Sequence, residues 1–254
     1  MKYESDQGIA HPVKCLRATA LRAAEPFLDF LLPPRCLSCD AVIRAADVLC
    51  PACLTESAVR MPTDEDCGAL LAGLTYRADV SMIHIGFEFE PGTAIAESIH
   101  TMKYRGMHSI GYWFGRLLGE QCMGKPILDG RPVLVPVPLH HVKRLERGFN
   151  QAESICRGLS FETGLPVYAH ALRRVRYTQS QAAMLLDKRE RRLNTLDAFV
   201  IDPRFPAVLR EHPVIIVDDL ITTGATMSDC VMVLRENGVQ DIRLLAVARP
   251  IPRT

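Results

Sequence analysis

The sequence has no long apolar run, and no segment approaches the roughly 20 apolar residues that a membrane-spanning helix needs. Its beginning does not resemble a secretory signal peptide, because Glu4 and Asp6 come early and charged residues interrupt each apolar stretch up to residue 35. We therefore expect a cytoplasmic protein. Neither sign of charge dominates, since the formal net charge is +1. This excludes a protein that holds nucleic acid through its overall charge, so any basic surface must be local.

The sequence also has no internal repeat, no low-complexity tract and no GxxxxGK[ST] motif, so the phosphate loop of the P-loop nucleotide hydrolases is absent. The composition is that of a globular protein, with 48% hydrophobic and 23% charged residues. A chain of 254 residues can hold one large α/β domain and a small accessory module.

Composition divides the chain into three zones: a helical leader at 1–35, a cysteine-rich module at 36–67, and an α/β domain at 75–254. The leader contains an amphipathic stretch at 13–32 that we expect to pack on the body; the alternative is contact with a membrane surface or a partner. In the third zone, apolar runs alternate with amphipathic stretches, which predicts a parallel sheet flanked by helices. We expect strands at 81–89, 133–137, 167–172, 214–217 and 244–247, and helices at 93–104, 109–123, 150–163 and 225–237.

Nine cysteines and no export signal indicate thiols or metal ligands rather than a disulfide framework. The spacing Cys36-x2-Cys39-x10-Cys50-x2-Cys53 places two CxxC pairs on short loops. Two such pairs complete a tetrahedral Zn²⁺ site, and four protein ligands make it structural rather than catalytic. The alternatives are a redox-active CxxC or unpaired structural cysteines, although a redox motif does not normally come doubled.

The run VIIVDDLITTGAT at Val214–Thr226 carries the clearest chemical signal. Four β-branched residues predict a central strand buried on both faces, and Asp218 and Asp219 follow where such a strand emerges. A bend rich in threonine, with Gly224 for the tight turn, then leads into a helix whose free N–H groups suit a phosphate monoester. The two carboxylates suit ribose hydroxyls or Mg²⁺. The alternatives are an acidic pair that caps the turn, or a Walker B strand that lacks its phosphate loop.

This run resembles the signature of type I phosphoribosyltransferases. The resemblance implies that Asp218 and Asp219 contact the ribose of phosphoribosyl pyrophosphate (PRPP). It also implies that the 5′-phosphate is held by the bend, which is formed by Thr222, Thr223, Gly224, Ala225 and Thr226.

A second loop follows the strand at 133–137 and is dense in positive charge, as a pyrophosphate site requires. The charges alone would also fit a solvated basic turn. The motifs PVP at 136–138 and RGFNQ at 147–151, followed by TTGAT, resemble the ComF family of competence and DNA-utilisation proteins, over about residues 36–249. Further matches are MKYRG at 102–106, Thr178, Gln181, Arg189, Asn194, Ala198 and Phe199.

The resemblance implies a type I phosphoribosyltransferase-like fold and a role in DNA uptake. The implied PRPP-binding residues are Pro138, Arg144, Arg147 and the acidic pair with its threonine bend, and Lys103 is added from its family position and charge. The implied catalytic set is Lys103, Arg147, Asp218 and Asp219. The implied cofactors are Mg²⁺ with PRPP and a structural Zn²⁺. Many members carry an N-terminal zinc finger and some have further paired cysteines, but only Cys67 stands in that region here, which puts a second metal site in doubt.

The segment between Arg173 and Arg192 is strongly basic. By position it resembles the hood that closes over PRPP and excludes water from the reacting sugar. The alternatives are a grip on single-stranded DNA, with Tyr177 and Phe199 as stacking faces, or a solvated Arg-rich helix.

The sequence is therefore compatible with two functions. The first is Mg²⁺-dependent transfer of phosphoribosyl to an acceptor that the sequence does not name. No residue stands out as its general base, and His140 and His141 suit the surface as well as catalysis. The second is a PRPP-sensing or single-stranded-DNA-binding adaptor for a competence helicase. A purely structural role does not call for clustered anion-binding loops.

Overall fold

The computed structural model describes residues 33–57, 62–75, 79–175 and 198–251, and contacts divide the chain into the units Met1–Cys50 and Pro51–Thr254. The first unit contains no regular helix or strand among its described residues. The bridge between Arg35 and Val42 closes a small loop there, and the Cys36 N–H donates to Ala41 O at 2.8 Å. The leader, apart from residues 33–35, lies outside the described residues.

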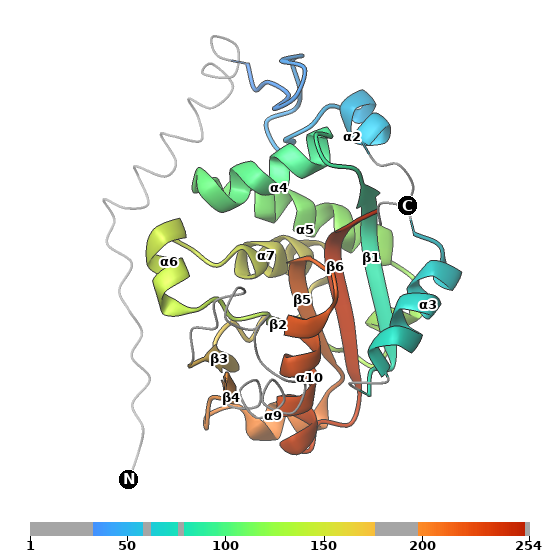
Figure 1. Ribbon diagram of the computed structural model, residues 1–254, viewed down its shortest axis with the longest axis vertical. Helices are drawn as coiled ribbons and strands as arrows, with labels where there is room; N and C mark the ends of the chain where they lie inside the picture. The colour runs from blue at the N-terminus through green and yellow to red at the C-terminus, as the bar shows by residue number, and fades with distance from the viewer. Residues whose placement is uncertain (1–32, 58–61, 76–78, 176–197, 252–254) are drawn as a thin grey trace, which may run out of the picture. The chain divides into compact units, whose positions relative to one another are not determined.

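The second unit is built on four parallel strands in the order β1-β6-β5-β2 (Figure 1). They are β1 (Met82–Phe89), β2 (Val133–Pro136), β5 (Val214–Leu220) and β6 (Ile242–Pro250). Strand β5 lies between β6 and β2, with Ile216 paired to Leu244 and to Val135. Its first four residues are fully buried, as expected for a strand covered on both faces.

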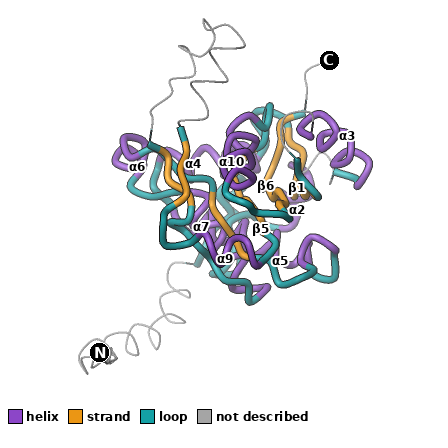
Figure 2. The backbone as a smooth tube through the Cα atoms, turned by 90° about the horizontal axis from the view of Figure 1, so that it is seen from below, coloured by secondary structure: helices purple, strands orange, loops and turns teal. Residues whose placement is uncertain are grey.

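Helices cover both faces of this sheet (Figures 1 and 2). On one face lie α5 (His108–Cys122) and α7 (Gln151–Thr163), and on the other lies α10 (Ala225–Glu236). The remaining helices are α2 (Pro51–Ser57), α3 (Asp64–Thr75), α4 (Ala94–Tyr104), the 3-10 turn η1 (Pro126–Leu128), α6 (His141–Arg147) and α9 (Pro206–Glu211). This confirms the predicted α/β class with a parallel sheet flanked by helices.

Helices α5 and α7 approach so closely that their backbones touch. A Cβ added at Gly115 would lie 2.0 Å from the carbonyl oxygen of Ile155, and one at Gly158 would lie 2.0 Å from that of Tyr112. Only glycine permits this approach. The contact fixes the position of α7, whose first residues lie beside the loop that follows β2.

One expected strand is wrong, and some short elements were not expected. In the segment 167–172, Val167 forms only a single bridge to Leu134, and the strand β3 spans Leu172–Arg174. It pairs antiparallel with β4 (Phe199–Ile201) in a separate two-stranded sheet. Only Ala171 and Leu172 of this segment are buried, and an apolar run can form a turn whose end is buried as well as a strand.

Candidate functional site

Asp218 and Asp219 both lie on β5, within its last three residues, at the carboxyl end of the sheet. Asp219 is 7% exposed and Asp218 is half-buried. The Asp219 N–H donates to Oδ1 of Asp218 at 2.8 Å, which orients the first carboxylate. The helices that follow β2 and β5 pack on opposite faces of the sheet, and α/β proteins bind ligands at the carboxyl ends of strands arranged in this way.

Lys103, in the last turn of α4, contributes a cation to this acidic pair. Its Nζ lies 3.0 Å from Oδ2 of Asp219, and the two side chains are only 18% and 10% exposed. The short distance in a site with little water makes this a strong ion pair. It brings the MKYRG motif to the acidic pair from a distant part of the sequence.

The carboxyl group of Asp218 has a raised pKa. Burial raises the pKa of Asp218, and the charge of Asp219 raises it further, to about 8 from the ordinary value of 3.8. The charges of Lys103 and Arg147 act in the opposite direction without reversing the shift. The raised pKa favours the protonated form of Asp218 near neutral pH, and Asp219 forms an ion pair with Lys103.

The bend after β5 leaves an open helix N-terminus. Gly224 has φ 69° and begins α10, and no side chain caps the first turn. Thr222 and Thr223 are exposed, and the first helical hydrogen bond runs from the Ser228 N–H to Gly224 O at 2.8 Å. Uncapped N–H groups, two hydroxyl groups and the positive end of the helix dipole together favour an anion.

The loop after β2 begins beside β5, because the Val137 N–H donates to Val217 O at 2.9 Å. Pro138 is buried, and Asn150 anchors the far end of the loop. Its Nδ2 donates to Val137 O at 3.0 Å, and its Oδ1 accepts from the Ala152 N–H at 3.2 Å, which caps α7. One asparagine thus ties the start of α7 to the end of β2.

His140 has a structural role in this loop. It is 3% exposed, and its Nδ1 accepts from the Val142 N–H at 3.3 Å, which caps α6. Burial lowers its pKa, and the charges of His141 and Arg174 lower it further, so the ring is neutral at pH 7. The other histidine, His141, is exposed.

The two arginines of the loop have different partners. Arg144 is 50% exposed and lies 3.6 Å from Oε2 of Glu153. Arg147 lies over the ring of Tyr104, 5.6 Å from its centroid, and donates to Oε1 of Gln151 at 3.2 Å. Of these two arginines, the positive charge of Arg147 is the one that acts to lower the pKa of Asp218.

Of the basic segment predicted as a hood, the structure describes Arg173 and Arg174. Arg174 lies over the ring of Phe199, 5.3 Å from its centroid, and Arg173 lies 3.6 Å from Asp202. Tyr177 and the basic residues from Arg176 to Arg192 fall in 176–197, outside the described residues. The hood therefore stays a prediction.

Sequence reasoning assigned no role to Gln151 and missed the partner of Arg144. Gln151 is 2% exposed and bonds Arg147 from the first position of α7. It belongs to the RGFNQ motif, and the four-residue separation of Arg147 and Gln151 was a signal that could have been used. Helix α6 was not predicted, because it has no buried residues and therefore no periodic apolar pattern in the sequence.

The four cysteines of the two CxxC pairs gather in one place, with their sulfur atoms all within 4.8 Å of one another. Cys39 Sγ and Cys50 Sγ lie 3.7 Å apart, and sulfurs on a tetrahedral Zn²⁺ with bonds of about 2.3 Å would be about 3.8 Å apart. Burial acts to raise the pKa of Cys36, but hydrogen bonds from the backbone of Cys39, Cys50 and Ser38 outweigh it and lower the pKa to about 6. The thiolate so favoured is the form that binds metal.

The family model described as a double zinc ribbon domain matches residues 27–80, which supports a structural zinc site. In the described part of the chain, the four cysteines are the one group of metal-ligand type. Among the described helices, none has the length and apolarity to span a membrane.

Curated relatives cover more of the chain. Competence protein F of Haemophilus influenzae is 35% identical over 46% of this chain and 49% of its own length. The DNA utilization protein YhgH of Salmonella typhi is 28% identical over 60% of this chain and 66% of its own length. Competence protein ComFC of Streptococcus pneumoniae is 26% identical over 84% of this chain and 87% of its own length. The chain thus spans about half the length of competence protein F and 66% of YhgH.

Two solved structures are also similar. One, described as the allosteric regulatory enzyme of purine biosynthesis, is 21% identical with a TM-score of 0.39, over 55% of this chain and 25% of the other. The other is the Trypanosoma cruzi hypoxanthine phosphoribosyl transferase, which is 13% identical with a TM-score of 0.36, over 60% and 77%. The curated relatives confirm the recognition made from the motifs: this chain is a homologue of the ComF-family proteins competence protein F, ComFC and YhgH.

Proposed function

We propose that the protein binds PRPP with Mg²⁺ at the carboxyl ends of β2 and β5, and transfers its phosphoribosyl group to an acceptor in DNA uptake or utilisation. One observation carries the proposal. An acidic pair, an uncapped helix N-terminus with exposed threonines, and two cations that act on the acidic pair, Lys103 and Arg147, occur together around the carboxyl end of β5. A ribose that carries a phosphate at one end and a diphosphate at the other requires these three kinds of group.

The ribose and its 5′-phosphate would lie along the end of β5. Carboxylates accept hydrogen bonds from ribose hydroxyls, and the N–H groups at the start of α10 donate to phosphate oxygens. The bend at Thr222–Thr226 follows the acidic pair directly, so one short segment would hold both parts of the ligand.

The residues at this site fit a Mg²⁺ ion that arrives with the ligand. Asp218 and Asp219 supply hard oxygen atoms, and no third metal-ligating side chain joins them within the described residues. Mg²⁺ is commonly held by one or two carboxylates together with substrate phosphates. Bound there, it would neutralise charge on the diphosphate.

In the reaction, the bond between the sugar C1 and the diphosphate breaks, and the electron pair leaves with the diphosphate. Positive charge then develops on the sugar, which the carboxylate of Asp219 would stabilise, while Lys103 and Arg147 would stabilise the leaving diphosphate. Fixed charges in a site with little water need no rearrangement as the charge develops. An electron pair of the acceptor then forms the new bond to C1, and the proton that the acceptor loses passes to water.

Diphosphate release from PRPP, measured across a library of bases and amines, tests this activity. We expect release that depends on Mg²⁺ and on one class of acceptor, and that falls by about 10³-fold in Asp219→Asn, because the ionised carboxylate is lost. Release that is equal in the wild type and in Asp219→Asn would contradict the assigned role.

A second candidate function rests on the relatives, whose names refer to competence and DNA utilization. On this hypothesis the protein is a PRPP-sensing or single-stranded-DNA-binding adaptor for a competence helicase, and does not turn PRPP over. Tyr104 favours it, because its ring is 66% exposed beside Arg147, and a base could stack on it. Binding of single strands that weakens with salt and survives Asp219→Asn would support the adaptor.

A further inference from the structure

The two arginines of the loop after β2, Arg144 and Arg147, are not equivalent, because their partners differ in charge. Arg144 lies 3.6 Å from the carboxylate of Glu153, which also pairs with Arg157 at 2.7 Å. Arg147 instead donates to an uncharged amide oxygen, that of Gln151, at 3.2 Å. Within the described residues, no carboxylate lies within ion-pair distance of Arg147. Its positive charge is therefore the less compensated of the two.

Gln151 is held rigidly where it meets Arg147. It is the first residue of α7 and is 2% exposed. Its neighbour Asn150 caps the helix and bonds the end of β2, and a Cβ added to Gly111 of α5 would lie 3.4 Å from the Gln151 carbonyl oxygen. A buried side chain on a fixed helix end can orient an arginine with little loss of entropy at the moment of binding.

The amide of Gln151 is also imperfectly satisfied. Its Nε2 is buried and has no hydrogen-bond partner in the described part of the chain. A buried donor without a partner is unfavourable, so packing alone would favour an apolar residue of the same shape. A glutamate would accept the bond from Arg147 more strongly, but it would neutralise the guanidinium and repel a diphosphate. A glutamine is the residue that orients Arg147 and leaves its charge intact.

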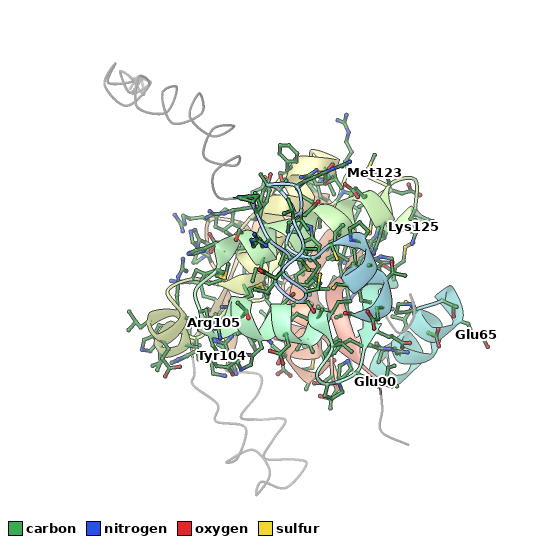
Figure 3. All side chains as sticks on the ribbon, turned by 90° about the horizontal axis from the view of Figure 1, so that it is seen from above. Glu65, Glu90, Tyr104, Arg105, Met123 and Lys125 are labelled. Atoms are coloured by element: carbon green, nitrogen blue, oxygen red, sulfur yellow. The ribbon has the colours of Figure 1, made fainter. Side chains whose placement is uncertain are left out.

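We propose that Gln151 is a positioning residue, which holds Arg147 toward a bound diphosphate through a neutral hydrogen bond, so that Arg147 rather than Arg144 dominates diphosphate binding. The guanidinium of Arg147 also lies over the ring of Tyr104, 5.6 Å from its centroid. Figure 3 shows Tyr104 next to Arg105 at the end of α4. This inference rests on the proposed function, since it concerns the diphosphate end of the same ligand.

Calorimetric titration with Mg²⁺-pyrophosphate and with PRPP tests it on the full chain. We expect Gln151→Glu to weaken both affinities by roughly tenfold or more, because a carboxylate then opposes the diphosphate and competes for Arg147. Gln151→Met loses only the hydrogen bond, so its loss should be smaller. When Arg147 is already replaced by Met, Gln151→Glu can act only by repelling the diphosphate directly. It should then weaken the affinity clearly less than it does in the wild type. Gln240→Glu makes the same charge change on an exposed residue at the amino end of β6, and should bind like the wild type.

Three results would overturn the inference. The first is a wild-type affinity in Gln151→Glu, and the second is an equal loss with or without Arg147. The third is a loss in Arg144→Met that exceeds the loss in Arg147→Met. Thermal unfolding of each variant shows whether a loss reflects the fold. If the wild type binds neither ligand, the proposed function fails and takes the inference with it; if the wild type binds and Gln151→Glu matches it, only the inference fails.

Discussion

At the residue scale, the two adjacent aspartates occupy different electrostatic states. Asp219 is neutralised by Lys103 at 3.0 Å, whereas Asp218 has a raised pKa. A strongly raised carboxyl pKa is typical of functional sites, which is consistent with the proposed ligand site. This difference leads to two predictions.

The first is that Asp218→Asn stabilises the ligand-free protein in alkaline solution. A folded-state pKa of about 8, above the ordinary 3.8, means that the folded protein binds more protons than the unfolded chain between these values. Stability therefore falls as the pH rises through this interval, and an amide removes the loss. We expect the unfolding midpoint at pH 8 to rise by about 2–4 °C, which corresponds to about 1 kcal/mol. Circular dichroism should show the gain at pH 8 and none at pH 4; an equal effect at both would contradict it.

The second is that Lys103→Met destabilises the fold, because it leaves the carboxylate of Asp219 buried without its cation. The free energy of unfolding, measured in urea, should fall by about 2–4 kcal/mol. Breaking a fully buried ion pair can cost more, but both side chains here retain some exposure to solvent. The double variant Lys103→Met/Asp219→Asn should recover part of this loss. No recovery would mean that the lysine acts through packing alone.

The acidic pair, the threonine bend and their place at a strand end could be predicted from the sequence, because one short segment contains all three. The partners of these residues could not. Lys103 reaches Asp219 from a position more than a hundred residues earlier, and nothing local to either residue specifies the distance between them. Likewise, His140 and His141 look alike in the sequence, and only the fold buries one of them.

At the scale of elements, the contact between α5 and α7 is the feature that positions the basic loop. Gly115→Ala should destabilise the protein by about 1–3 kcal/mol, because the new methyl group would lie 2.0 Å from a backbone oxygen and the helices must separate. Gly68→Ala in α3 is the matched control, since nothing lies within 4 Å of its added Cβ. In Gly68→Ala, the higher helix propensity of alanine should raise the free energy of unfolding by up to about 1 kcal/mol. Equal effects of the two changes would show that the contact is not tight.

The cysteine cluster yields a prediction about metal content. Purified protein should contain one zinc per chain by elemental analysis, and Cys50→Ser should lose it, because a missing thiolate opens the tetrahedral site. Cys67→Ala should keep its zinc, since Cys67 lies on α3 outside the cluster. Two zinc ions per chain in the wild type would show that the ribbon is double here as well.

The long elements could be predicted because each carries an apolar period or a buried β-branched run. The strand at 214–217 is the start of β5, and the expected helix at 225–237 corresponds to α10. The short elements could not. Helix α6 contains no buried residue, and β3 and β4 are three residues each, too short for a period to appear. The glycines of α5 did not by themselves predict a close helix contact, because their role depends on the helix that packs against them.

At the scale of the whole molecule, parallel topology brings separate segments to one edge. The loops after β2 and β5 are about 80 residues apart in the sequence, yet the Val137 N–H bonds Val217 O. A formal net charge of +1 conceals a group of cations that act on one another, Lys103, Lys143, Arg147 and Arg174, of which Lys103 and Arg147 also act on the acidic pair. Burial lowers the pKa of Lys143, and the charges of Arg147 and Arg174 lower it further, as expected where cations gather.

The most direct test of this account is calorimetric titration with PRPP, with and without Mg²⁺, of the wild type and of Asp218→Asn/Asp219→Asn. We predict binding by the wild type that is strengthened by Mg²⁺, and a loss of at least about tenfold in the double variant, because it removes both carboxylates that hold the ribose. Equal binding in the two proteins, or no binding by a folded wild type, would contradict the claim that the end of β5 holds a sugar phosphate.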